Sequence, residues 1–159
     1  MSESAPSQPE ASKVKKSVAL SGVSAGNTAV CTVGRTGNDL RYRGYDIAEL
    51  SDKASFEEVA YLLIHGELPT RPGLAQYHKK LKGLRNLPAP LKAVLERIPA
   101  AAHPMGVMRT GCSVLGTLLP EKDDHSAAGA RDIADRLIAC FGSMLLYWHH
   151  FSRNRRRVE

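Results

Sequence analysis

Two basic residues, His103 and Arg109, stand in a mostly apolar stretch, and side chains of these types can take part in chemistry. His103 directly precedes Pro104, where a helix is expected to begin, so its imidazole can bond to the free backbone N–H groups of the first turn. Arg109 follows among methionine and valine side chains, where a buried guanidinium needs an anionic partner. That partner is either a substrate carboxylate or a protein carboxylate, and we favour the structural ion pair.

Metal binding is not indicated by the histidine pattern. The six histidines are His65, His78, His103, His125, His149 and His150. The adjacent His149 and His150 would point about 100° apart on a helix, so they cannot easily share a metal ion. The run Asp123-Asp124-His125 offers cation ligands, but Lys122 beside it favours a solvated loop before a helix. We therefore expect no metal site.

The three cysteines are Cys31, Cys112 and Cys140, and they form no Cys-x-x-Cys pair. This pattern argues against a structural zinc site and a secreted disulfide framework, and it favours a reducing cytoplasm. Neither Cys31 nor Cys112 stands beside an evident base, so a catalytic cysteine is not expected. A glycine-rich phosphate loop, a Gly-x-Ser-x-Gly elbow and a His-Glu-x-x-His helix are also absent from the sequence.

The elements that would position these residues are mostly helices. Residues 28–33 and 39–42 read as one short β-hairpin, and helical spacing follows it without a further strand. Ser55 and Glu58 form a capping box that begins a helix, which Gly66 ends. Further helices are expected over residues 72–82, 90–98, 104–119 and 126–153. The sequence thus predicts a mainly α fold, a multi-helical body with one short N-terminal β-hairpin.

The spacing of apolar residues also predicts which helix faces are buried. The expected inward positions are Phe56, Val59, Ala60, Leu63, Ile64, Leu74, Tyr77, Leu81, Leu91, Val94, Leu95, Ile98, Met105, Met108, Cys112, Leu115, Ile133, Leu137, Phe141, Met144, Trp148 and Phe151. Val107, Val114 and Leu118 lie near the stripe of their helix, and Ile138, Leu145 and Leu146 widen that of the last helix. Gly106, Gly111 and Gly116 would each weaken an exposed helix by about 1 kcal/mol, so they indicate close packing against another backbone. The helix over residues 104–119 should therefore be buried on most sides.

Composition excludes several classes of protein. The 159 residues are 43% hydrophobic and 24% charged, close to the average for globular proteins. The net charge of +6 comes partly from residues 78–85 and 153–157, which lack interleaved aromatics, so nucleic-acid binding is not expected. The longest apolar segment, residues 137–148, is too short to cross a bilayer. Residues 1–16 are polar and predict a disordered arm.

Several longer motifs, taken in order, resemble the citrate synthase family and, within it, the methylcitrate branch. The matching stretches are Leu20-Ser21-Gly22-Val23, Leu40-Arg41-Tyr42-Arg43-Gly44-Tyr45-Asp46-Ile47, residues 56–69, His103-Pro104-Met105 with Arg109-Thr110-Gly111, and residues 129–135. The resemblance covers residues 16–151.

This resemblance implies a mainly helical dimeric enzyme with a large and a small domain, whose subunits would meet through the helices over residues 90–98 and 104–119. The family condenses an acyl-CoA with oxaloacetate, and for this branch the acyl-CoA is propionyl-CoA. The CoA thioester is a substrate, so neither a cofactor nor a metal is implied. In the family an aspartate removes the α-proton and two histidines assist.

The same resemblance implies that no catalytic residue lies in this chain, because the family's catalytic histidines and aspartate would follow Glu159. No catalytic role therefore passes to any of the six histidines, and the substrate-binding residues stay unknown. We expect residues 17–159 to be the N-terminal part of the large domain, with the rest of that domain and the small domain missing, and the isolated chain to be inactive. Two alternatives to this function stay open: an ordinary citrate synthase that uses acetyl-CoA, and a non-catalytic helical dimerisation module.

Overall fold

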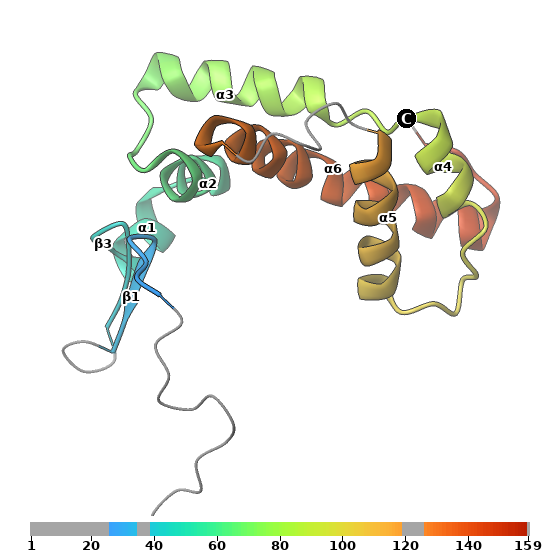
Figure 1. Ribbon diagram of the computed structural model, residues 1–159, viewed down its shortest axis with the longest axis horizontal. Helices are drawn as coiled ribbons and strands as arrows, with labels where there is room; N and C mark the ends of the chain where they lie inside the picture. The colour runs from blue at the N-terminus through green and yellow to red at the C-terminus, as the bar shows by residue number, and fades with distance from the viewer. Residues whose placement is uncertain (1–25, 35–38, 119–125, 159) are drawn as a thin grey trace, which may run out of the picture.

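The computed structural model describes residues 26–34, 39–118 and 126–158, and over these residues the chain is mainly helical (Figure 1). The elements in chain order are β1 (Cys31–Val33), β2 (Leu40–Tyr42), β3 (Tyr45–Asp46), α1 (Ile47–Lys53), α2 (Phe56–His65), α3 (Arg71–Leu84), α4 (Ala89–Leu95), α5 (Pro104–Leu118) and α6 (Ala127–Asn154). The predicted class, mainly α with a short β element near the N-terminus, is confirmed.

The strands form a small antiparallel sheet in which β2 lies between β1 and β3. Cys31 faces Tyr42 across the first pair of strands, and Tyr42 faces Tyr45 across the second. Both residues between β2 and β3 have positive φ, 50° at Arg43 and 92° at Gly44, as in a type I′ hairpin turn. The sequence predicted only the first hairpin. The third strand was missed because it has two residues and its turn carries arginine where asparagine or aspartate is usual.

The first two helices begin at side-chain caps. Asp46 accepts a hydrogen bond from the Ala48 N–H at 2.9 Å and so begins α1, a helix that was not predicted separately. Ser55 Oγ accepts from the Glu58 N–H at 3.3 Å, while the Glu58 carboxylate accepts from the Ser55 N–H at 2.8 Å. The Ser55 hydroxyl also donates to this carboxylate at 2.8 Å, and the two bonds from the Ser55 N–H and hydroxyl lower the pKa of Glu58. The predicted capping box is confirmed. Gly66, with φ of 98°, ends α2 as predicted.

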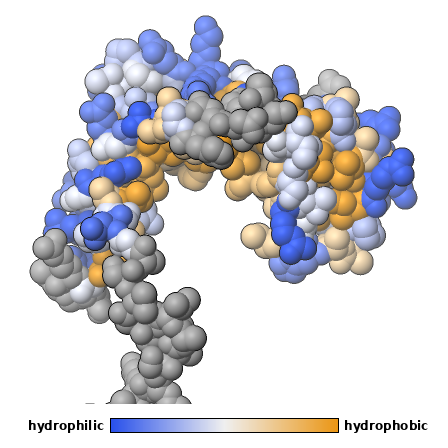
Figure 2. Space-filling view, viewed as in Figure 1, coloured by the Kyte–Doolittle hydropathy of each residue, from blue (hydrophilic) through white to orange (hydrophobic). Residues whose placement is uncertain are grey.

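Helices α2, α3, α4 and α5 all pack against the 28-residue helix α6. Helix α3 runs beside its first half, and α4 and α5 pack against its second half (Figure 1). The sheet, α1 and α2 form one leg of an arch, and α4 and α5 form the other. Figure 2 shows apolar residues gathered along the concave side of this arch.

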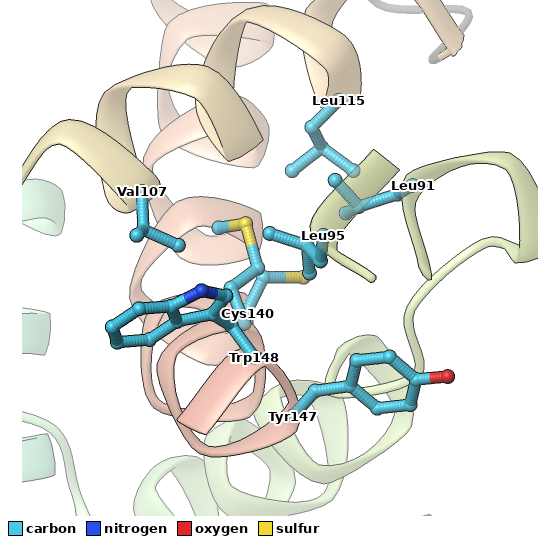
Figure 3. Packing of buried hydrophobic residues seen from close by; sticks show 8 residues of the cluster. Leu91, Leu95, Val107, Leu115, Cys140, Tyr147 and Trp148 are labelled. Carbon is cyan, nitrogen blue, oxygen red and sulfur yellow. The ribbon is translucent and has the colours of Figure 1, made fainter. Parts of the chain in front are cut away.

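The main apolar core joins α4, α5 and α6 (Figure 3). Its buried residues are Leu91, Leu95, Val107, Leu115, Cys140, Met144, Tyr147 and Trp148. The Trp148 indole N–H donates to the Ile98 carbonyl at 3.2 Å, and the Tyr147 hydroxyl donates to the Glu96 carboxylate at 2.7 Å. These two bonds satisfy the polar ends of the large aromatic side chains. A second cluster joins α2, α3 and α6 through Ala60, Tyr77, Leu81 and Ala139.

Some predicted faces are wrong. Phe56 is 71% exposed, Met105 68%, Leu146 57% and Phe141 40%, because each lies on the side of its helix that no described neighbour covers. Helix α5 is buried on one side only, by α4 and α6, and not on most sides as predicted. Leu62, which was not among the expected inward positions, is fully buried, and so is Val107, which was expected near the inward stripe and not within it.

The three glycines of α5 behave differently from one another. A Cβ on Gly111 would lie 2.6 Å from Met144 Sδ, whereas a Cβ on Gly106 or Gly116 would meet nothing within 4 Å. The predicted close packing is therefore present at Gly111 alone. Gly111 packs against the side chain of Met144 and not, as predicted, against another backbone.

Three expectations from the sequence lie outside the described residues: the arm over residues 1–16, the motif over residues 20–23 and the acidic run over residues 123–125. Among the helices that the structure describes, none is long and apolar enough to cross a membrane.

Candidate functional site

A buried carboxylate, Asp135 on α6, lies at the centre of a polar cluster that the sequence analysis did not predict. Its side chain is 0% exposed. Oδ1 accepts a hydrogen bond from the Tyr77 hydroxyl at 2.8 Å, and Oδ2 accepts from Lys80 Nζ at 2.6 Å. Tyr77 and Lys80 are three residues apart on α3, so they present their polar groups on the same side of that helix. Lys80 Nζ also bonds to Asp132 Oδ1 at 2.8 Å.

His65, the last residue of α2, completes the cluster. Its Nε2 lies 3.5 Å from Asp135 Oδ2, which is longer than an ordinary hydrogen bond. This nitrogen is buried and has no hydrogen-bond partner among the described residues. The imidazole stacks on Tyr61 with 4.2 Å between ring centroids, and it meets the edge of Tyr77 at 5.7 Å. Ring packing therefore holds His65 in place.

The protonation states in the cluster follow from burial and hydrogen bonding. Burial raises the pKa of Tyr77, and the hydrogen bond to Asp135 raises it further, so the phenol stays neutral. Burial lowers the pKa of Lys80, but the hydrogen bonds to Asp132 and Asp135 outweigh it, and the net shift is upward. Lys80 is thus held as an ammonium against a carboxylate.

This arrangement favours a structural role over catalysis. Asp135 is inaccessible to a substrate, and both of its oxygens already accept hydrogen bonds. The cluster joins α2, α3 and α6 by groups that would be costly to bury unpaired. One signal could have revealed it: Tyr77 was predicted to face inward, and a buried tyrosine hydroxyl needs a partner.

The two residues singled out in the sequence lie at the start of α5 but do not form a site together. The Met105 N–H donates to His103 Nδ1 at 3.2 Å, so His103 caps the helix as expected. Arg109 is exposed, and no ion pair among the described residues includes it. The expectation of a buried arginine is therefore wrong, because Arg109 lies on the uncovered side of α5.

The cysteines show no sign of activation. Cys140 is buried, and its thiol lies 3.1 Å from the Leu84 carbonyl. Burial raises the pKa of Cys140 and of the half-buried Cys112, which disfavours the reactive thiolate. Cys31, Cys112 and Cys140 are all free thiols.

Within residues 26–34, 39–118 and 126–158, no group of three or more histidine, cysteine, aspartate or glutamate side chains could hold a metal ion. His78 and His149 are exposed, and His150 is half-buried. The predicted alternative of a cation at residues 123–125 falls outside these ranges.

A cavity of about 460 Å³ lies beside α6, between the end of α3 and α4. Its wall includes the basic side chains Arg85, Lys92 and His150. The sequence analysis took the basic residues around Arg85 for a solvated helix face. The three residues come from three elements, so only the packing of the helices brings them to one cavity.

Comparisons with known proteins agree with this fold. The family model described as "Citrate synthase, C-terminal domain" matches residues 19–159. A 2-methylcitrate synthase of Shewanella oneidensis is 57% identical over 140 residues, which cover 88% of this chain and 36% of that protein. A citrate synthase-related protein of Dictyostelium discoideum is 45% identical over 130 residues, 82% of this chain and 30% of that protein.

Solved structures are similar as well. The crystal structure of citrate synthase from Thermotoga maritima matches 88% of this chain and 36% of its own, with 30% identity and a TM-score of 0.72. Citrate synthase from Pyrobaculum aerophilum matches 88% of this chain and 37% of its own, with 28% identity and a TM-score of 0.77. The chain thus spans about a third of the length of the proteins that it matches, from 30% to 37% in these four.

Proposed function

Because the chain belongs to the citrate synthase family, we propose that it supplies helical scaffold to an acyltransferase that condenses propionyl-CoA with oxaloacetate and water, giving 2-methylcitrate and CoA. The observation that carries this proposal is the 57% identity, over 88% of the chain, to a protein named 2-methylcitrate synthase. A 2-methylcitrate synthase of Mycobacterium tuberculosis, 39% identical over 130 residues, supports the same choice. We place the reaction in propionate catabolism in the cytoplasm, in line with three free cysteines.

The domain assignment is part of the proposal. Residues 17–159 would form one unit, the N-terminal part of the family's large domain. The unbroken match of the family model over residues 19–159 supports treating them as one unit.

The proposal assigns no catalytic residue to these 159 residues and treats the isolated chain as inactive. Support comes from the arrangement of the described histidines. His65 is packed beside a buried carboxylate whose oxygens are occupied, and His103 is a helix cap. Neither is paired with an accessible base as an acyl-CoA condensation requires.

A second copy of the chain is the proposed partner, with α5 at the interface. The uncovered side of α5 carries small residues at Gly106, Ser113 and Gly116, and at Gly106 and Gly116 there is open space where a Cβ would be. Small residues on one side let two helix backbones approach closely. Sedimentation should show a dimer that Gly116→Leu weakens, and a monomer at all concentrations would contradict this pairing.

A chimeric enzyme tests the function. Residues 19–159 would replace the matching segment of the Shewanella relative, and thiol release would be followed with propionyl-CoA or acetyl-CoA plus oxaloacetate. We expect the chimera to release thiol at a rate close to that of the relative, because the segment supplies scaffold that the two proteins share. A folded chimera that condenses neither acyl-CoA would contradict the assignment.

Two other functions have specific support. The similar solved structures are titled citrate synthase, which favours acetyl-CoA as substrate. The matched segment is only 36% of the Shewanella relative, so the acyl preference is measured on a full-length protein that contains these residues, and a preference for acetyl-CoA there would select that function. A non-catalytic helical dimerisation module is favoured by exposed apolar side chains such as Leu146, 57% exposed, and Phe141.

A further inference from the structure

The cavity beside α6 has the volume of a small-molecule site and is open to solvent along the exposed residues Arg85, Asn86 and Leu146. Its volume of about 460 Å³ falls within the ~300–1,000 Å³ of typical ligand pockets. Four separate segments form its wall: residues 85–87 just after α3, Lys92 on α4, the second half of α6, and Val158 beyond the end of α6.

The charged side chains of the wall are all basic. They are Arg85 and Lys92, the imidazole of His150 stands beside them, and no aspartate or glutamate lines the cavity. Lys92 Nζ lies 5.5 Å from the Tyr147 ring centroid, and no carboxylate of the described residues is paired with Arg85 or Lys92. The positive charge facing the cavity is therefore not neutralised within the described chain.

A neighbouring carboxylate that could neutralise this charge is already engaged. Glu96, which lines a smaller adjoining cavity, accepts hydrogen bonds from the Tyr147 hydroxyl at 2.7 Å and from Arg157 Nε at 2.8 Å. Its second oxygen accepts from Arg157 Nη2 at 3.0 Å. In Figure 3 the Tyr147 hydroxyl points away from the apolar core, as this contact requires.

The rest of the wall combines uncharged donors with apolar surface. Asn86 and Ser143 contribute an amide and a hydroxyl, and Leu87 and Leu146 contribute apolar side chains. A ligand that uses every part of this wall has a negatively charged group and an apolar body.

We propose that this cavity binds a small organic dianion, a phosphate monoester or a dicarboxylate, that carries an apolar group. Arginine presents several donors in a plane and suits a phosphate or carboxylate, and lysine adds a point charge. Lys92 is half-buried, so its attraction for an anion is stronger than in open water, whereas Arg85 is exposed. The proposal does not depend on the acyltransferase assignment.

Isothermal titration of the 159-residue chain tests the ligand class. The probes are phenyl phosphate, phenylmalonate, inorganic phosphate and benzyl alcohol, and fluorescence of Trp148, next to Tyr147, gives a second readout. We expect at least one of the two aromatic dianions to bind, with inorganic phosphate and benzyl alcohol at least tenfold weaker. The stronger of the two dianions distinguishes a phosphate site from a dicarboxylate site. Absence of binding by both, or equal affinity for inorganic phosphate, would overturn the proposal.

Matched variants test the location. Arg85→Met and Lys92→Met should each weaken binding at least tenfold, whereas Lys79→Met should not change it. Lys79 is exposed on α3 and does not line the cavity, so this control removes the same charge from elsewhere. Arg85 is exposed at the end of α3, so Arg85→Met tests the site even if Lys92→Met fails to fold. Equal weakening by Lys79→Met, or unchanged binding by Arg85→Met, would overturn the location.

Discussion

Replacing Asp135 by asparagine should destabilise the protein by removing the negative charge at the centre of the buried cluster. Breaking a buried ion pair typically costs about 3–5 kcal/mol. Here Lys80 is 40% exposed and keeps its contact with Asp132, so its ammonium can be solvated after the substitution. The asparagine oxygen can still accept from Tyr77. We therefore expect Asp135→Asn to lower the free energy of unfolding by about 2 kcal/mol, less than the full cost of a broken pair.

The assay is urea and thermal unfolding followed by far-UV circular dichroism. A loss of about 2 kcal/mol corresponds to a fall in Tm of about 4–8 °C in a chain of this size. Asp132→Asn is the matched control: it also removes a carboxylate bonded to Lys80, but that side chain is 58% exposed. An exposed pair contributes less than about 1 kcal/mol, so the control should change little. A loss below about 0.5 kcal/mol for Asp135→Asn, or an equal loss for both variants, would refute the reasoning.

Three further predictions concern pH and packing. Burial and the bond to Asp135 raise the pKa of Tyr77 in the folded state, so its contribution to stability is full below pH about 10 and falls as the pH rises above it. The free energy of unfolding in urea, measured from pH 8 to 11, should therefore fall less steeply with pH in Tyr77→Phe than in the parent. An equally steep fall in both would contradict this. Hydrogen bonds from Arg157 and Tyr147 lower the pKa of Glu96 to about 2, so its contribution to stability is full above about pH 4.5 and is lost as the pH falls towards 2. Between these pH values the Tm of Glu96→Gln should therefore fall less than the Tm of the parent. An equal fall in both would count against the contact. Gly111→Ala should cost about 1–3 kcal/mol, because its Cβ would meet Met144 Sδ, whereas Gly106→Ala should be neutral or stabilising by up to about 1 kcal/mol; urea unfolding of the two variants compares them, and equal costs would refute the packing argument.

Local signals in the sequence predicted the helices well. The capping box at Ser55 and Glu58 and the positive φ at Gly66 depend on residues within one turn of each other, so the sequence contains all that determines them. Helix α5 begins at Pro104 as predicted for the same reason.

Contacts between distant elements could not be predicted in the same way. The burial of Asp135 depends on Tyr77 and Lys80, which are 58 and 55 residues away along the chain. Arg109 lies among apolar residues in the sequence, yet it is exposed because α4 and α6 cover the opposite side of α5. Helical periodicity identifies the apolar face of a helix, but how much of that face is buried depends on the positions of the neighbouring helices.

The cavity beside α6 also results from contacts between elements that are far apart in the sequence. Along the chain, Lys92 lies 7 residues after Arg85, and His150 lies 58 residues after Lys92. No motif joins them, and they meet only because α3, α4 and α6 pack together.

The central claim, that these residues provide family scaffold without the catalytic groups, is tested most directly by thiol release from propionyl-CoA and acetyl-CoA with oxaloacetate. The purified 159-residue chain would be assayed beside the active Shewanella relative. We predict thiol release by the relative and none above the buffer rate by the chain. Oxaloacetate-dependent release by the chain would contradict the account and would show that residues such as His103 or Arg109 take part in chemistry.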